Sequence, residues 1–135
     1  MTHYESTLLR LQSFEAKKYG DYKRAIFFRY QIFEQGMAEL DDFYFLGQWS
    51  VEVNEYEFAE KMLTQCIEWG KNGGNGWYDS CAYLLRAYAF IKCNRMQEAE
   101  NDLQYIERHF TDSCVMWLTY HPSINMTYLK QLKYR

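Results

Sequence analysis

Hydrophobic residues recur at helical spacing along most of this 135-residue chain. In residues 4–19, 55–69 and 95–110 the apolar side chains fall on one side of a helix, and Glu, Lys and Gln fall on the other, as in an amphipathic helix. Residues 77–92 are apolar almost all round, which predicts a helix enclosed by its neighbours. One Pro in the whole chain leaves little to interrupt helices, so the pattern predicts an all-α fold.

Short breaks separate the helical segments. Gly20, Asn54 and Asn94 each stand between two of them, and Gly and Asn favour the left-handed conformation that ends a helix. Connections this short fold the flanking helices back as antiparallel hairpins. The longest break, residues 70–76, holds four Gly and Lys71. Because the Lys precedes the glycines and no strand leads in, we interpret it as a helix end and a linker rather than a phosphate-binding loop.

The breaks belong to an internal repeat. Each of the three segments carries an Ala five residues after its break and an apolar residue seven positions later. These residues are Ala25, Ala59 and Ala99, followed by Ile32, Cys66 and Ile106. The Ala residues are 34 and 40 residues apart, and the break at 70–76 accommodates the six extra residues.

Small residues also stand in the first helix of each pair, and an aromatic residue follows two of the breaks. They are Ser13, Gly47 and Ala87, with Tyr22 and Tyr56. Over about residues 6–110 this arrangement resembles the tetratricopeptide (TPR) family, whose unit is a 34-residue helix–turn–helix. The resemblance implies a right-handed stack of about three antiparallel helix pairs. It also implies a single domain over residues 1–135, with units at about 6–37, 40–70 and 77–110.

Residues 113–135 are expected to form a C-terminal capping helical segment, because the terminal faces of a repeat stack need covering. Residues 113–120 are apolar and fit a helix or a strand, of which we favour the helix. Pro122 and Ser123 then have the character of a helix start. The apolar face of the helix that follows consists of Ile124, Tyr128, Leu129 and Leu132.

In TPR-like stacks the first helices of the pairs line a concave side that receives the partner. Carrying these family positions over to this chain gives a partner-binding set: Arg10, Phe14, Lys17, Tyr44, Gln48, Glu52, Leu84, Tyr88 and Ile91. Tyr and Arg are frequent anchors of binding hot spots. Phe14, Leu84 and Ile91 are equally consistent with a place in the core.

Charge is distributed unevenly along the chain. Residues 1–33 carry six basic and three acidic residues, whereas residues 34–68 carry nine acidic residues and one basic. Within the second stretch an acidic patch, Glu52, Glu55, Glu57 and Glu60, is suited to attract a basic partner at long range. The net charge of −3 lacks the basic footprint of a nucleic-acid-binding protein.

The sequence offers no catalytic or metal-binding constellation. The four Cys form no CxxC pair and the three His are scattered, so neither a metal nor a cofactor is expected. Cys81 lies in the most apolar segment, which favours a buried structural thiol over a nucleophile. No leader-like start and no run of 18 apolar residues occurs, so we expect a cytoplasmic protein that does not cross a membrane.

These observations favour a non-enzymatic module that binds a protein or peptide, such as an adaptor, a chaperone or an immunity protein that neutralises a toxin. Some TPR relatives hold a peptide's terminal carboxylate with a Lys/Asn/Arg clamp, but here Phe14 and Gln48 stand where Asn is expected. The alternative is a self-assembling structural unit, a homodimer that buries Trp49, Trp77 or Trp117. An RNA-binding helical repeat would need a broadly basic groove.

Overall fold

The computed structural model describes residues 1–73, 76–110 and 124–133. Helices account for nearly all of the described part, and it contains no strand. The helices are α1 (His3–Lys18), α2 (Tyr22–Glu34), α3 (Leu40–Glu52), α4 (Tyr56–Lys71), α5 (Asp79–Lys92), α6 (Met96–His109) and α8 (Met126–Lys133). The segment 113–120, Pro122, Ser123 and Trp117 lie outside the described residues.

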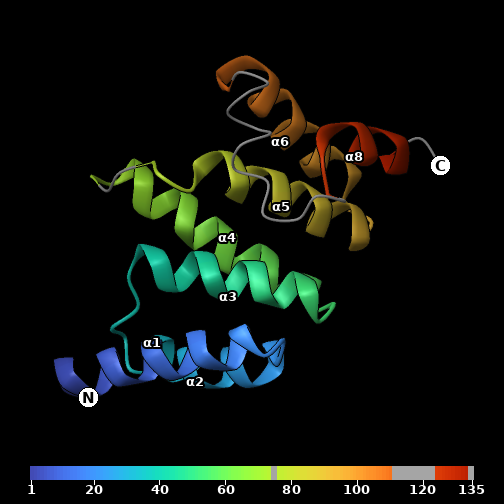
Figure 1. Ribbon diagram of the computed structural model, residues 1–135. Coiled ribbons are helices and arrows are strands. Elements are labelled where there is room, and N and C mark those ends of the chain that lie inside the picture. Colours follow the sequence, from blue (N-terminus) through green and yellow to red (C-terminus); the bar gives the residue numbers. More distant parts are fainter. Residues whose placement is uncertain (74–75, 111–123, 134–135) are drawn as a thin grey trace.

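The helices pack in antiparallel pairs that follow one another along a stack (Figure 1). The pairs are α1 with α2, α3 with α4, and α5 with α6, while α2 packs on α3 and α4 packs on α5. From α1 to α6, consecutive helices are therefore neighbours, as expected for a repeat whose units bury their faces against each other. The predicted all-α stack of helix pairs is confirmed.

The predicted breaks form three turns of the same geometry. Gly20, Asn54 and Asn94 have φ angles of 77°, 64° and 60°, the left-handed region in which Gly and Asn cost least. At each turn the next backbone N–H donates to a carbonyl oxygen five residues back: Asp21 to Ala16 at 3.0 Å, Glu55 to Ser50 at 2.8 Å and Arg95 to Phe90 at 2.8 Å. This bond satisfies a carbonyl that the helix end leaves open.

The small residues of the repeat lie where the two helices of a pair approach most closely. Ala25, Ala59 and Ala99 are fully buried. A Cβ atom added to Gly47 would lie 2.6 Å from Cγ of Leu63 in the paired helix. A larger side chain at these positions would force the two helices apart.

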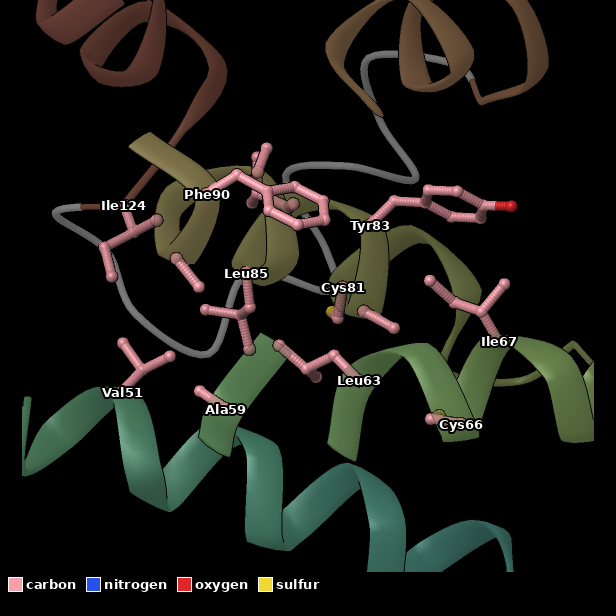
Figure 2. Packing of buried hydrophobic residues seen from close by; sticks show 14 of the residues in the cluster. Val51, Ala59, Leu63, Cys66, Ile67, Cys81, Tyr83, Leu85, Phe90 and Ile124 are labelled. Atoms are coloured by element: carbon pink, nitrogen blue, oxygen red, sulfur yellow. The ribbon is translucent and has the colours of Figure 1, made fainter. Parts of the chain in front are cut away.

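Helix α5 lies at the centre of the main core, as its all-round apolar sequence predicts. It packs against α4 and α6, and ten of its residues are buried. Figure 2 shows Leu85 and Cys81 pointing toward α4, and Phe90 and Tyr83 on the other side of the helix. Side chains on nearly every face of α5 are therefore buried on folding. This explains why the α5 sequence has no polar face.

Helix α8 packs on α5 with the face predicted from the sequence. Ile124 and Leu129 are buried, and Tyr128 and Leu132 are half-buried against the core. Lys130 of α8 forms an ion pair with Glu107 of α6. The C-terminal helix thus contributes apolar side chains to the third pair.

Replacing Ala59 with Leu is expected to lower the free energy of unfolding by about 1–3 kcal/mol, because the added atoms have no room between α3 and α4. Thermal unfolding followed by circular dichroism measures the loss. Lys61→Leu, which adds a Leu at an exposed position of the same helix, is the control. Unchanged unfolding of the Ala59 variant would contradict the close contact of the pair.

Candidate functional site

The residues of the predicted partner-binding set lie on α1, α3 and α5, but they differ widely in exposure. Tyr44, Leu84 and Ile91 belong to the core, with 0%, 2% and 8% of their surfaces exposed. The ring of Tyr44 is stacked on that of Tyr78, with centroids 4.2 Å apart. A partner could reach these three side chains only by displacing what covers them.

The accessible members of the set are concentrated on α1. Phe14 is 42% exposed, and Lys17 in the last turn of α1 is exposed. Arg10, Gln48, Glu52 and Tyr88 are half-buried. This face therefore combines an aromatic surface with basic charge at α1 and becomes more covered toward α5.

Arg10 joins the first helix pair to the second. Its Nε donates to Oδ1 of Asp42 at 3.0 Å and its Nη2 donates to Oδ2 at 2.7 Å, a two-pronged bond that fits the planar guanidinium. Hydrogen bonding to Asp42 raises the pKa of Arg10. The backbone N–H of Glu39 also donates to Asp42, at 2.9 Å. Asp42 therefore caps the N-terminus of α3 and also binds α1 through Arg10.

A second guanidinium, that of Arg29 on α2, is buried beside this pair. Its side chain is 1% exposed, and its Nη1 lies 3.6 Å from Oδ1 of Asp42. Its Nε donates to Oγ of Ser13 at 3.2 Å, whereas Nη1 and Nη2 have no hydrogen-bond partner among the described residues. Burial lowers the pKa of Arg29 to about 10. Arg10, Arg29 and Asp42 together carry one net positive charge.

Three aromatic rings surround the Arg29 guanidinium. Its central carbon lies 4.5 Å from the ring centroid of Phe14, 5.1 Å from that of Phe45 and 5.3 Å from that of Trp49. Contacts of this kind stabilise a desolvated cation through the ring faces. Phe14, the most exposed aromatic of the predicted set, therefore lies directly against the buried cation.

Arg29 was not among the predicted site residues, although the repeat carried a signal. The spacings of 34 and 40 residues place Arg29 at the position of Leu63 and Leu103, both of which are buried. Ser13 stands at the repeat position of Gly47, the glycine that contacts Leu63. A charged residue at a position that is otherwise Leu could have marked the first pair as unusual.

The acidic patch lies at the end of α3 and the start of α4. Glu55 and Glu57 are exposed, and Glu52 and Glu60 are half-buried. Glu60 lies 3.5 Å from Nη1 of Arg95, so its charge is partly balanced by the third pair. The exposed negative charge of the patch is concentrated at the first turn of α4.

Tyr88 connects α5 to its neighbours. Its ring is in edge contact with Tyr56, at a centroid distance of 5.8 Å, and lies 6.3 Å from the ring of Tyr128 in α8. The Nζ atom of Lys92 lies 5.6 Å from the centroid of the Tyr88 ring. Burial raises the pKa of Tyr88. Part of this side chain is therefore already engaged within the chain.

An open pocket of about 410 Å³ lies between α1 and α2, and none of its lining residues belongs to the predicted set. It is lined by Gln12, Glu15, Ala16, Tyr19, Asp21, Arg24 and Phe28. Phe28 supplies an apolar wall and is covered on one side by the guanidinium of Arg24, 5.4 Å from the ring centroid. The sequence pattern did not predict this pocket.

No three His, Cys, Asp or Glu residues among the described residues gather closely enough to hold a metal ion. Burial raises the pKa of Cys66 to about 12, and Cys81 is buried in the core. None of the described helices is long and apolar enough to cross a membrane.

The helix pairs, the small residues between them and the turns at Gly20, Asn54 and Asn94 define the tetratricopeptide-repeat fold. The second TPR domain of the human RPAP3 protein, solved by NMR in complex with the HSP70 peptide SGPTIEEVD, is similar to this chain. The similarity has a TM-score of 0.68 at 24% sequence identity and covers 98% of each chain. Comparisons with known protein families and with curated proteins find no match.

Proposed function

We propose that this chain is a non-enzymatic module that binds a protein or peptide across the face formed by α1, α3 and α5. The observation that carries the proposal is Phe14. Its ring is 42% exposed yet held against the buried Arg29. An aromatic side chain that is partly exposed and already in contact with its neighbours loses less conformational freedom on binding than a free one, and aromatic residues are frequent hot-spot anchors.

The charges of this face and of the acidic patch at the start of α4 favour an extended partner with acidic and basic ends. Lys17 and Lys18 are exposed beside Phe14, and Glu55 and Glu57 are exposed at the start of α4. A partner with acidic residues toward α1 and basic residues toward α4 would be complementary to both. The domain of similar fold noted above also holds a peptide, which supports a peptide ligand for this chain.

Three residues of the predicted partner-binding set are buried, so only the accessible ones are proposed to contact the partner. Phe14, Lys17, Gln48, Glu52 and Tyr88 are accessible at least in part and are proposed to contact the partner. Arg10 acts through its bonds to Asp42, which fix α1 relative to α3. Tyr44, Leu84 and Ile91 support these contacts from the core.

Selection of peptides from a displayed random library on the immobilised chain tests this proposal. We expect selected peptides to carry acidic residues near an apolar residue, and we expect Lys17→Glu to weaken their binding about tenfold, as for loss of a partly desolvated charge contact. Lys71→Glu, a reversal of an exposed charge at the other end of α4 from the acidic patch, is the control. Selected peptides that bind both variants as well as the parent chain would contradict the proposed face.

Binding of the acidic HSP70 peptide SGPTIEEVD would distinguish a domain that recognises chaperone tails from other peptide-binding domains. Phe14 and Gln48 occupy the places of the clamp Asn residues in this chain, so we expect only weak binding of this peptide in a fluorescence anisotropy titration. Tight binding that is lost in Lys17→Glu would instead assign the chain to the chaperone class. Adaptor and immunity roles would follow from the identity of the full partner.

A further inference from the structure

The guanidinium of Arg29 is buried with most of its hydrogen-bond donors unused. Its side chain is 1% exposed, and its Nε donates to Oγ of Ser13. Nη1 and Nη2 have no acceptor among the described residues, although both nitrogens are donors only. Because a buried donor without an acceptor costs stability, these N–H groups favour a ligand that accepts hydrogen bonds.

Asp42 is not that acceptor, because its two oxygens are already engaged. Oδ1 accepts from Nε of Arg10 at 3.0 Å, and Oδ2 accepts from Nη2 of Arg10 at 2.7 Å and from the backbone N–H of Glu39 at 2.9 Å. Nη1 of Arg29 lies 3.6 Å from Oδ1, too far for a hydrogen bond. Asp42 therefore acts on Arg29 as a nearby charge, and that charge is shared with Arg10.

The aromatic rings around Arg29 stabilise its charge but offer no acceptor. Phe14, Phe45 and Trp49 contact the guanidinium through their rings, which attract a cation. Trp49 is fully buried inside the chain, which contradicts the expectation that a homodimer buries it. Its Nε1 also has no acceptor among the described residues. The surroundings of Arg29 therefore add a donor rather than an acceptor.

The charges of the cluster favour a ligand with one negative charge. Arg10, Arg29 and Asp42 together carry one net positive charge. Asp41 also acts on Arg29, but it is exposed, so water and salt weaken its effect. A carboxylate matches the remaining charge, and its two oxygens can accept from two N–H groups of a guanidinium. A phosphate group carries more negative charge than the cluster balances.

Phe14 lies between Arg29 and the proposed partner face. Its ring centroid is the nearest of the three to the guanidinium, at 4.5 Å, and the residue is 42% exposed. Phe45 is half-buried and Trp49 is fully buried. Rotation of the Phe14 side chain is therefore the change that exposes Arg29 with the least loss of burial.

We propose that Arg29 binds one carboxylate group, which enters as the Phe14 side chain turns aside and accepts from Nη1 and Nη2. In a complex this group is an Asp or Glu side chain of the partner, an assignment that rests on the function proposed above. A free small carboxylate has the same chemistry. The site differs from the Lys/Asn/Arg clamp, because Arg29 belongs to α2, whereas Phe14 and Gln48 at the clamp positions belong to α1 and α3.

Titration of the full chain with sodium formate tests the site itself. The indole N–H signals of isotope-labelled protein are followed by NMR, and Trp49→Phe identifies the signal of Trp49. We expect this signal to shift and saturate, because its ring contacts the guanidinium. Arg29→Leu in the same salt is the matched control, since it leaves every exposed charge in place, and it should show no saturable shift.

Arg29→Met keeps the length of the side chain and should behave like Arg29→Leu, with circular dichroism showing that both variants remain helical. A parent chain without a saturable shift would mean that water alone satisfies Arg29 and would overturn the proposal. An equal saturable shift in the Arg29 variants would overturn it as well.

Phe14→Ala tests the route to Arg29. The smaller side chain covers less of the guanidinium, so formate should reach half-saturation at a lower concentration than in the parent chain. Half-saturation at the same or a higher concentration would contradict the displacement of Phe14.

Peptides selected on the chain separate a partner's carboxylate from a free one. We expect a selected acidic peptide to compete with formate and to bind Arg29→Leu about tenfold more weakly than the parent chain. A peptide that binds both equally would overturn the assignment to the partner, while the proposed function would stand. If no peptide is selected but formate still binds only the parent chain, the carboxylate site stands and the proposed function fails.

Discussion

Replacing Asp42 with Ala is expected to destabilise the chain by about 3–5 kcal/mol, the usual cost of leaving a buried charge without its partner. Arg29 is 1% exposed, and Asp42 is the carboxylate beside it. Arg10 also loses its two-pronged bond, but its side chain is 23% exposed and can turn toward water. Urea unfolding followed by circular dichroism measures the loss.

A second substitution, at Arg29, tests whether the unpaired Arg29 charge causes that loss of stability. Leu at position 29 would recreate the residue found at the equivalent Leu63 and Leu103, and replacing a buried charge by a well-packed apolar side chain is often neutral. We therefore expect Asp42→Ala with Arg29→Leu to be more stable than Asp42→Ala alone by about 1–3 kcal/mol, a coupling typical of contacting charges. Equal stability of the two variants would show that the buried cation is not responsible.

An exposed ion pair serves as the comparison for the buried one. Arg95 and Glu98 pair on the surface within the third helix pair. Because water solvates each charge when the other is removed, Glu98→Ala should leave the unfolding midpoint nearly unchanged. A loss as large as that of Asp42→Ala would mean that burial does not set the cost.

Replacing Leu63 with Ala is expected to cost about 2–5 kcal/mol, because it leaves a cavity in a fully enclosed site. Leu63 is 0% exposed and fills the space opposite Gly47, where an added Cβ would approach its Cγ to 2.6 Å. Gly47→Ala alone overpacks this contact, which lowers stability. The better helix propensity of Ala raises stability by about 0.5–1 kcal/mol and offsets part of that loss.

Combining the two changes is expected to recover stability. In the Leu63→Ala background, the methyl group that Gly47→Ala adds enters part of the vacated space, so the double variant should be more stable than Leu63→Ala alone. Ile67→Ala is the control background, because Ile67 is buried one turn further along the same helix. Equal recovery by Gly47→Ala in both backgrounds would show helix propensity alone and contradict the direct contact.

The turns and the close contacts within each pair were predictable because they depend on neighbouring residues. Gly20, Asn54 and Asn94 end helices through their own backbone preferences, and the observed φ angles agree. The Ala residues of the repeat follow from a spacing visible in the sequence. These features need no knowledge of how one pair packs on the next.

The exposure of the predicted partner-binding residues, in contrast, depends on how one helix pair packs on the next. The family positions place Tyr44, Leu84 and Ile91 on the first helices of the pairs, yet these side chains are buried. Ile91 and Leu84 lie in the same core as Ile124 and Leu129 from the C-terminal segment, which the repeat pattern does not place. Exposure depends on every element that packs nearby, so helix periodicity alone could not assign it.

The sequence by itself determined that the chain is helical, where its helices turn, and which small residues lie between the members of each pair, because these properties are encoded by residues close together along the chain. Only the tertiary structure decided that Asp42 joins Arg10 and Arg29 and that Phe14 remains half-exposed above the buried cation. It also revealed that Tyr4, Leu8 and Leu11 of α1 are exposed. Burial and ion pairing between helices depend on distances that only the packed stack defines.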